Sequence, residues 1–329
     1  MQSPRYPTYS AADVARLLDY GACIDAVRDA MAGLTRDGFE QPLRNIVPMG
    51  GGRMFALMPG VGHSALGFGA KLISVFPDPA RAGRSAHRGV VVLFDATEGT
   101  VRCVADAGAI TEIRTGCASA VATDALARPD ARVLAIFGTG TQARSHALAV
   151  TRVRPFERLV LWGRDADRAT SLQRELAGSL PLRIETTRDG REAALAADVI
   201  CTVTGSTTPI LERAWVRAGT HVNVVGSSML GPVEVDSELV RDSRYVADYR
   251  RSALAAAAEL ALAKQRGFVT DDHIVAEIGE VLLGRVPGRR SADEITMYKS
   301  LGHVVQDLAA ATVVLQRDQN AVVTVSTTS

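Results

Sequence analysis

The chain of 329 residues has few aromatic side chains and no excess of charge of either sign. Phenylalanine, tryptophan and tyrosine make up 5% of it, and 37 basic residues stand against 36 acidic ones. Proteins that bind nucleic acids or anionic membrane surfaces usually carry a basic excess, so we expect neither partner. No apolar run approaches the roughly 20 residues of a membrane-spanning helix, and no membrane association is predicted.

Cysteine is also scarce, and its positions argue against disulfides. Cys23, Cys103, Cys117 and Cys201 are scattered and form no C-x-x-C pair, which predicts reduced, mostly buried thiols. The first residues lack the apolar core of a signal peptide, so we expect a cytoplasmic protein. The six histidines show no ligand spacing, and no metal site is predicted.

The most informative stretch is residues 132–137, which are apolar except for Arg132 and run into a glycine-rich turn and then a helix. It is the G-x-G-x-x-A dinucleotide fingerprint in its strand–turn–helix context. The glycines permit the turn and the approach of a pyrophosphate, which the helix N-terminus attracts. The alternative is a glycine turn in another kind of α/β protein, but a second predicted strand, 159–162, follows at a helix-length interval. We therefore expect a nucleotide to bind at Gly138, Thr139, Gly140, Thr141, Gln142 and Ala143.

The residues after the second strand bear on which coenzyme binds. An NAD site usually has an acidic residue about 20 positions beyond the glycines, to hold the ribose 2′-hydroxyl. This chain has Arg164 and then Asp165, with Arg168 one turn later. A guanidinium binds a 2′-phosphate bidentately, whereas Asp165 suits a 2′-hydroxyl. We predict that NADP(H) is preferred over NAD(H) and that Arg164 and Arg168 contact it.

Helices and strands alternate after this point, which is typical of a doubly wound parallel sheet. Two loops follow predicted strands and are expected over the cofactor crevice, so Thr204 and Gly226 are candidate cofactor contacts. The predicted helices span 166–177 and 190–196, and the predicted strands span 182–185, 199–203, 222–225 and 245–247.

The N-terminal third has a different pattern. A helix capped by Ser10 and a helix at 24–35 precede a run of short strands, which indicates an α+β region. A long helix of small residues, 109–126, leads to the nucleotide strand, and a helical tail is predicted over 298–315. The short strands are predicted at 43–48, 53–58, 67–75, 90–95 and 100–105.

Several segments together resemble the ornithine cyclodeaminase/mu-crystallin family over nearly the whole chain. The resemblance implies an α/β fold: a doubly wound Rossmann NAD(P)-binding domain, 118–299, inserted between the two parts, 1–117 and 300–329, of an α+β substrate-binding and dimerisation domain. It also implies a homodimer and small α-amino or α-imino acid substrates. The segments are Gly69–Leu72, Ala109–Asp124 with its Arg114-Thr115-Gly116 centre, Phe137–Ala143, Trp162–Arg164, Val225–Ser228 and Lys299–Gly302.

Three basic residues match the positions at which this family binds the substrate carboxylate: Arg44, Lys71 and Arg114. A carboxylate that enters a closed site needs charge-assisted hydrogen bonds to replace its water. Lys71 lies among glycine and apolar residues, which is unusual for a solvated face. For Arg114 the alternative is a local ion pair with Glu112 or Asp124.

Two positions depart from the cyclodeaminase pattern. The loop aspartate that handles the amine or a water in those enzymes is matched by Ser228, and a glutamate is matched by Ala56. Both carboxylates that would manage the nitrogens of a diamine are therefore missing, which disfavours ornithine cyclodeamination. Ketimine reductases of the mu-crystallin type also have a non-acidic residue on that loop. Ser228 can hold a water or donate to an imine, or it can simply cap a turn.

We therefore predict an NAD(P)H-dependent reductase of small cyclic imino acids. It would convert Δ1-pyrroline-2-carboxylate to L-proline or Δ1-piperideine-2-carboxylate to L-pipecolate. Lys71 and Ser228 are the predicted catalytic residues, and Arg44, Lys71 and Arg114 are predicted to bind the carboxylate. The alternatives are an ornithine cyclodeaminase, an amino-acid dehydrogenase, and a non-catalytic binding protein of the mu-crystallin type.

Overall fold

The computed structural model describes residues 6–62, 67–76 and 87–326, which fall into two compact units. Unit 1 combines Met1–Arg114 with His303–Ser329, and unit 2 is Thr115–Gly302. Within the described ranges, no helix has both the length and the apolar character needed to cross a membrane.

Unit 1 is built on a seven-stranded sheet within the described part of the chain. The strand order is β1-β7-β6-β5-β4-β2, with β3 paired to β4, and β4 to β7 form an antiparallel meander. The sequence predicted β3 to β7 but not β1 or β2, because two residues are too few to show a periodicity. The strands are β1 (Thr8–Tyr9), β2 (Phe39–Glu40), β3 (Asn45–Pro48), β4 (Met54–Gly62), β5 (Phe68–Val75), β6 (His87–Phe94) and β7 (Val101–Asp106).

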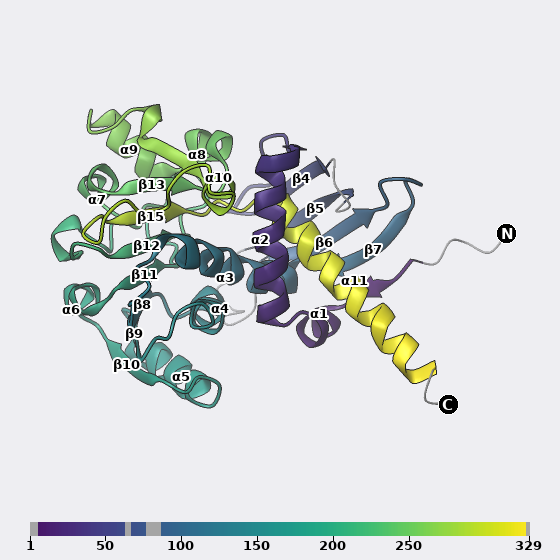
Figure 1. Cartoon of the computed structure of the whole chain (residues 1–329), viewed down its shortest axis with the longest axis horizontal. Helices are drawn as coiled ribbons and strands as arrows, with labels where there is room; N and C mark the ends of the chain where they lie inside the picture. Colours follow the sequence, from purple (N-terminus) through teal and green to yellow (C-terminus); the bar gives the residue numbers. More distant parts are fainter. Residues whose placement is uncertain (1–5, 63–66, 77–86, 327–329) are drawn as a thin grey trace. The chain divides into compact units, whose positions relative to one another are not determined.

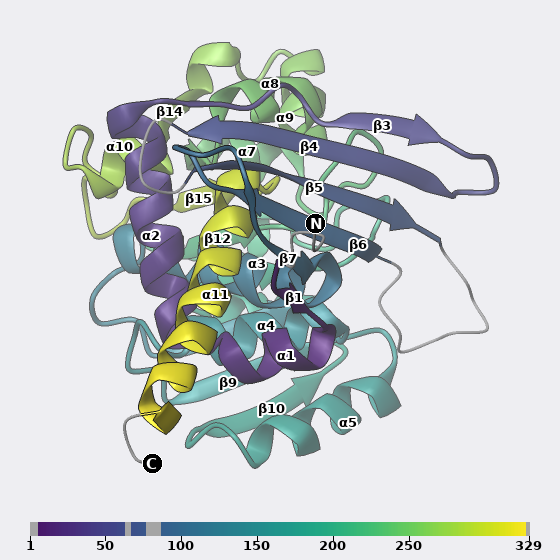
Figure 2. The same cartoon turned by 90° about the vertical axis from the view of Figure 1, so that its right-hand side faces the viewer.

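Three helices accompany this sheet: α1 (Ala11–Leu17), α2 (Tyr20–Asp37) and α11 (Val304–Ser326). As predicted, Ser10 caps α1, and it forms a capping box with Asp13. The next helix is longer than predicted because Asp19 caps it four residues earlier, accepting from Ala22 N. α11 packs on β4 to β7 and along α2 (Figures 1 and 2), so that one face of the sheet lies beneath this helix.

Alternation along the meander decides which side chains lie beneath α11. Met58, Lys71 and Val91 are partners on neighbouring strands, and all three are nearly or completely buried. The opposite face is apolar and open, with Phe55 40% and Val61 50% exposed. Because side chains alternate along a strand, the register itself sends the ammonium of Lys71 inward.

Unit 2 contains an eight-stranded sheet in the order β10-β9-β8-β11-β12-β15-β13-β14, and all neighbouring strands in it are parallel. This confirms the predicted doubly wound α/β architecture, in which β8, the strand before the glycine turn, lies between β9 and β11. The strands are β8 (Val133–Phe137), β9 (Arg158–Trp162), β10 (Arg183–Thr187), β11 (Val199–Thr202), β12 (His221–Val224), β13 (Arg244–Ala247), β14 (Ile274–Glu277) and β15 (Thr296–Lys299).

The prediction of a helical tail from residue 298 was wrong at its start. Tyr298 and Lys299 end strand β15, which is inserted between β12 and β13, and the helix begins only at Val304. A four-residue strand is too short to show a period, and its hydrogen-bonding partners lie far back in the sequence. Tertiary pairing therefore decides its conformation.

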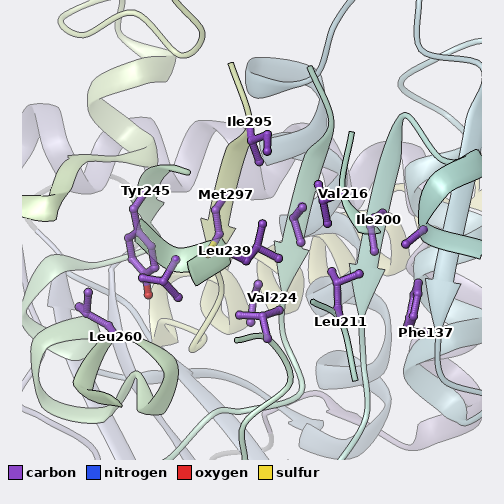
Figure 3. Close-up of a cluster of buried hydrophobic side chains, with 14 of the residues drawn as sticks. Phe137, Ile200, Leu211, Val216, Val224, Leu239, Tyr245, Leu260, Ile295 and Met297 are labelled. Carbon is purple, nitrogen blue, oxygen red and sulfur yellow. The ribbon is translucent and has the colours of Figure 1, made fainter. Parts of the chain in front are cut away.

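Helices cover both faces of this sheet, with α6 and α7 on one side of the strands and α3 and α4 on the other (Figure 1). The core on the α6 and α7 side includes Phe137, Tyr245 and Met297 (Figure 3). On the other side, a Cβ on Gly116 of α3 would lie 2.7 Å from the carbonyl oxygen of Ser145 in α4, so glycine allows these helices to touch. The helices are α3 (Ala107–Leu126), α4 (Thr141–Val150), α5 (Ala166–Ala177), α6 (Gly190–Ala196), α7 (Ser237–Asp242), α8 (Arg250–Ala256), α9 (Ala258–Gln265) and α10 (Ile278–Leu282), with short 3-10 turns at Arg213–Trp215 and Asp271–His273.

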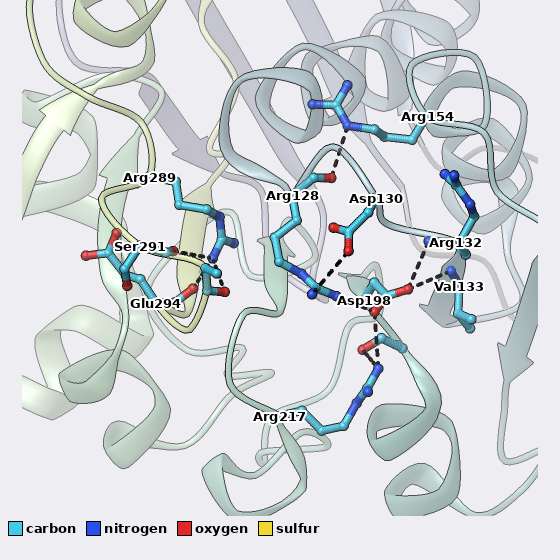
Figure 4. A network of polar contacts seen from close by, with 12 residues as sticks. Arg128, Asp130, Arg132, Val133, Arg154, Asp198, Arg217, Arg289, Ser291 and Glu294 are labelled. Atoms are coloured by element: carbon cyan, nitrogen blue, oxygen red, sulfur yellow. Dashed lines mark hydrogen bonds and ion pairs between the residues drawn. The ribbon is translucent and has the colours of Figure 1, made fainter.

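The amino-terminal edge of the sheet is held by a carboxylate, Asp198 (Figure 4). Its Oδ2 accepts from the backbone N–H groups of Arg132 and Val133 at 2.9 and 3.0 Å. Its Oδ1 accepts from Arg128 at 2.8 Å and from Arg217 at 3.2 Å. The arginines around Asp198 are thus engaged in fixing where β8 and β11 begin.

Candidate active site

A buried cluster in unit 1 joins two of the three predicted carboxylate-binding residues. Lys71 of β5 and Arg114 of α3 both contact Oδ1 of Asp307 in α11, at 3.0 and 3.1 Å. The exposed fractions are 2% for Lys71, 5% for Arg114 and 0% for Asp307. Two cations and one anion leave an excess positive charge inside unit 1, which is the charge needed to attract a carboxylate.

Further hydrogen bonds fix the direction of both cations. Lys71 Nζ donates to Thr111 Oγ1 at 2.5 Å, and Arg114 Nη1 donates to Gln306 Oε1 at 2.6 Å. Lysine carries three N–H donors and arginine five. One proton of Lys71 and the Nη2 group of Arg114 therefore keep no partner among the described residues, and remain able to bind a ligand.

Burial and charge tune the two ionisable partners in different directions. Burial lowers the pKa of Lys71 to about 8, an effect that Asp307 opposes and that Arg114 and Arg44 reinforce. For Asp307, burial acts to raise the pKa, but the charges of Arg114 and Lys71 outweigh it and hold the pKa below its usual range. At neutral pH the cluster thus contains a carboxylate and an ammonium whose proton is held less tightly than that of an ordinary lysine.

Arg44, the third predicted residue, lies just before β3 and is half-buried. Its charge contributes to the lowered pKa of Lys71, so the two side chains act on each other electrostatically. The alternative considered for Arg114, a local pair with Glu112 or Asp124, is not what forms. Arg114 binds Asp307 and Gln306, while Asp124 pairs with Arg154.

Asp307 was missed by the sequence interpretation, which concentrated on the cations. The signal was present: Gln306 and Asp307 interrupt an apolar run, Val304-Val305 before them and Leu308 after them, directly beyond the Lys299–Gly302 segment. A charged residue on the buried stripe of a helix is rare unless it is paired. Oδ2 of Asp307 is buried and has no partner among the described residues.

The glycine turn in unit 2 has the shape that a pyrophosphate requires. Gly138 has φ +140°, and a Cβ there would lie 2.9 Å from Val203. Around Gly140, by contrast, no heavy atom lies within 4 Å of an added Cβ, and no side chain caps the N-terminus of α4. The first-turn N–H groups of α4 are therefore left to face an open space. These residues fit a dinucleotide.

The two arginines predicted to contact the coenzyme both follow β9 in the chain. Arg164 and Arg168 are exposed, and in residues 6–62, 67–76 and 87–326 neither guanidinium group has a hydrogen-bond or ion-pair partner. Asp165, the alternative ligand for a 2′-hydroxyl, caps α5 instead: its Oδ1 accepts from the backbone N–H groups of Asp167 and Arg168 at 3.0 and 3.1 Å.

Glu234 ties together the loops that carry Thr204 and Gly226. It is completely buried and accepts from Thr204 N at 2.6 Å, Gly226 N at 2.7 Å and Thr202 Oγ1 at 2.9 Å. A Cβ on Gly226 would lie 1.9 Å from the carbonyl oxygen of Thr204. The backbone donors of Thr204 and Gly226 are thus used within the protein, and these residues shape the crevice rather than donating to a ligand from those atoms.

Ser228 is half-buried in the loop after β12, next to an anchored neighbour. Ser227 donates its hydroxyl to Glu259 and accepts from Lys299 Nζ at its carbonyl oxygen (2.6 Å) and its Oγ (2.7 Å). Lys299 and Glu259 are an ion pair with exposed fractions of 0% and 1%. Neither was assigned a role from the sequence. Lys299 and Glu259 fix the position of Ser227, the residue directly before Ser228.

Among the described residues, no group of three or more histidine, cysteine, aspartate or glutamate side chains is arranged to hold an ion. The chemistry available comes from the buried Lys71–Arg114–Asp307 cluster and from the nucleotide-shaped turn at Gly138–Ala143.

Comparison with known proteins agrees with these features. The sequence model of the ornithine cyclodeaminase/mu-crystallin family matches residues 8–321. The chain belongs to this family. The resemblance inferred from the motifs is therefore confirmed, and it extends over both units.

Three relatives are especially similar to this family member. The ketimine reductase mu-crystallin of Mus musculus is 34% identical over 278 residues, covering 84% of this chain and 85% of the relative. A Delta(1)-pyrroline-2-carboxylate reductase of Bacillus cereus is 30% identical over 310 residues, covering 94% and 95%. Among solved structures, Thermococcus litoralis Delta(1)-pyrroline-2-carboxylate reductase in complex with NADH and L-proline has a TM-score of 0.92 at 29% identity, covering 96% and 98%.

The shape of the glycine turn gives a first testable prediction. Gly140→Ala should leave the melting temperature unchanged, because its Cβ meets open space, but should weaken NADPH and NADH binding by about tenfold or more as the methyl group fills the pyrophosphate position. Fluorescence titration with each nucleotide measures this. Gly138→Ala is the comparison: its φ of +140° should make it lower the melting temperature as well. Normal coenzyme binding by Gly140→Ala would contradict the assignment.

Proposed function

We propose that this protein is an NAD(P)H-dependent reductase of small cyclic imino acids. Δ1-Pyrroline-2-carboxylate and Δ1-piperideine-2-carboxylate are the proposed substrates, and L-proline and L-pipecolate the products. The observation that carries the proposal is the buried cluster of Lys71, Arg114 and Asp307, which offers uncommitted N–H donors for a carboxylate. The similarity to two reductases of this class supports the same reaction.

The coenzyme is proposed to be a nicotinamide dinucleotide held by unit 2. Support comes from the open turn at Gly140 and from the Thermococcus litoralis relative, which was solved with NADH. We further propose that NADP(H) is preferred over NAD(H). Arg164 and Arg168 are exposed cations beyond β9, and Asp165 is engaged in capping α5, so this position suits a phosphate better than a hydroxyl.

In the proposed mechanism, residues of unit 1 hold the imino acid by its carboxylate. Arg114 donates from Nη2 while Asp307 and Gln306 hold its Nε and Nη1. Lys71 donates a hydrogen bond from its remaining N–H group, and Arg44 adds positive charge from just before β3. Because the partners behind the cations are fixed, little reorganisation is needed when the carboxylate replaces its water, which favours a defined orientation.

Protonation of the imine nitrogen makes C2 more electrophilic. Lys71 carries a proton at neutral pH, and its pKa of about 8 lets it release that proton more readily than an ordinary lysine. When bound, the reduced nicotinamide supplies the hydride that adds to C2. Ser228, directly or through a water, orients the nitrogen. Lys71 and Ser228 are thus the proposed catalytic residues, and Arg44 and Arg114 the proposed substrate anchors.

We also propose that unit 1 forms the dimerisation surface of a cytoplasmic homodimer. The outer face of its sheet exposes apolar side chains that a monomer would leave in water, among them Val47 (51%), Phe55 (40%) and Val61 (50%). All four cysteines are buried, free thiols, as a reducing compartment would maintain them.

The direct test of the function is an assay with the two ring sizes and the two coenzymes. We expect oxidation of NADPH, followed at 340 nm, with Δ1-pyrroline-2-carboxylate or Δ1-piperideine-2-carboxylate, and slower oxidation of NADH. Ornithine with catalytic NAD⁺ should release no ammonia, because a cyclodeaminase recycles its coenzyme and this chain lacks the two carboxylates of that reaction. Ammonia release, or no turnover of either imino acid, would contradict the proposal.

The carboxylate anchors can be tested by removing them singly. Lys71→Ala and Arg114→Ala should each lower kcat/KM at least tenfold, which is about 1.4 kcal/mol of transition-state stabilisation. Arg16→Ala, which removes an exposed cation of unit 1 paired with Asp13, is the control and should change kcat/KM less than twofold. Near-normal kcat/KM in both site variants, with NADPH binding intact, would remove this assignment.

The activity should depend on pH through Lys71. The protonated form predominates below its pKa of about 8, so kcat/KM should fall as the pH rises through that value. Asp307 opposes the lowering of this pKa, so Asp307→Asn should lower it further and move the alkaline limb to lower pH. The substrate titrates identically in both assays, and the difference between the two profiles reports the enzyme group.

A matched control for that shift is Asp318→Asn, which changes another aspartate of α11, one that accepts from Tyr9 Oη. Its alkaline limb should coincide with that of the wild type. An Asp307→Asn profile that is unmoved, or displaced to higher pH, would show that Asp307 does not hold the proton on Lys71.

A further inference from the structure

We propose that Arg188 is a third residue of the site for the 2′-phosphate of NADP(H), beside Arg164 and Arg168. This inference rests on the coenzyme preference proposed above, and it adds a residue from a different strand. Arg188 directly follows β10 and is exposed, and it lies in no sequence motif that indicates a role.

The strand register brings Arg188 to the edge of the sheet where Arg164 lies. Thr187 and Trp162, the last residues of β10 and β9, are register partners. The N–H group of Gly163 donates to the carbonyl oxygen of Thr187 at 3.3 Å, which extends the pairing past the strand ends. Neighbouring strands lie about 4.8 Å apart, so the backbone of Arg188 begins one strand width from the Gly163–Arg164 turn.

The backbone of this loop is held firmly, whereas the guanidinium is uncommitted. Trp162 Nε1 donates to the carbonyl oxygen of Arg188 at 3.0 Å. Thr187 Oγ1 accepts from Asp189 N at 3.1 Å and donates to Glu192 Oε2 at 2.9 Å. Asp189 in turn caps α6 by accepting from Glu192 N. The carboxylates nearest in sequence are therefore engaged, and the side chain of Arg188 has no partner among the described residues.

The chemistry of a phosphate explains why a third cation matters here. A single exposed ion pair is worth little because water and salt screen it, whereas several charges converging on one group form a network. Arg164 and Arg168 follow β9 in the chain and Arg188 follows β10, so a phosphate between them would be held by planar guanidinium groups that come from beyond the ends of two neighbouring strands. A 2′-hydroxyl is uncharged, so the third arginine should strengthen the binding of NADP(H) and leave that of NAD(H) unchanged.

At the opposite edge of the same sheet, arginines are paired with a carboxylate of the protein itself. There Arg128 and Arg217 both bind Asp198, which has an exposed fraction of 11% (Figure 4). At the carboxyl edge, no acidic side chain among the described residues pairs with Arg164 or Arg188. The arginines that bind Asp198 therefore have a structural role, whereas the guanidinium groups of Arg164 and Arg188 remain able to bind a ligand.

The test measures nucleotide affinity, and therefore does not depend on which imino acid is turned over. Kd values for NADPH and NADH are determined on the full chain by fluorescence titration, with 2′,5′-ADP and 5′-ADP as competing probes. Arg188→Ala should weaken NADPH and 2′,5′-ADP by about fivefold or more while NADH and 5′-ADP stay within about twofold. Arg174→Ala is the control, because Arg174 is also exposed but lies in the last turn of α5, and it should change none of these values.

Each other outcome is decisive. If Arg188→Ala weakens NADPH and NADH equally, or weakens neither, while the wild type prefers NADPH, the role of Arg188 is overturned and the proposed coenzyme preference stands. If the wild type binds NADH as tightly as NADPH, the coenzyme preference fails and this inference fails with it. An unchanged melting temperature of Arg188→Ala shows that the loop, held by its backbone bonds, has kept its structure.

Discussion

The structure of unit 1 depends on one buried carboxylate that serves two cations. Asp307 Oδ1 accepts from Lys71 and Arg114 at 3.0 and 3.1 Å with almost no exposure of any of the three side chains. Without Asp307, two like charges would be buried side by side, so that Lys71 would have to lose its proton or one of the two side chains would have to return to water. With Asp307, part of the buried positive charge is balanced, and each cation keeps an N–H donor that has no partner among the described residues. These donors lie in the core of the unit, where we propose that the carboxylate of an acid binds.

Buried carboxylates have the same organising role in unit 2. Asp198 fixes where β8 and β11 begin, and Glu234 fixes where β11 and β12 end. Burial raises the pKa of Glu234, an effect that its hydrogen bonds from Thr204 and the charge of Lys299 only partly offset. Each of these carboxylates accepts hydrogen bonds from backbone N–H groups at a strand end. The loops over the nucleotide crevice therefore have a defined shape before any coenzyme arrives.

Much of this organisation could be read from the sequence, because the decisive signals are local. The fingerprint at Gly138–Ala143, the capping by Ser10 and the small residues of the long helix α3 each follow from adjacent positions. The part that escaped depends on contacts between distant segments. β15 is a strand only because β12 and β13 flank it. Asp307 meets Lys71 only because α11 packs on β5. Arg188 likewise comes near Arg164 through the pairing of β9 with β10, and no sequence motif predicts that register.

The central claim is that Lys71 and Arg114, held from behind by Asp307, anchor the carboxylate of the imino acid. The most direct measurement is a crystal structure with the oxidised coenzyme and L-proline bound. We expect the carboxylate oxygens of proline within about 3 Å of Lys71 Nζ and Arg114 Nη2, hydrogen-bond distance for a charged pair, with both contacts to Asp307 retained. Proline bound elsewhere, with no contact to either cation, would contradict the claim.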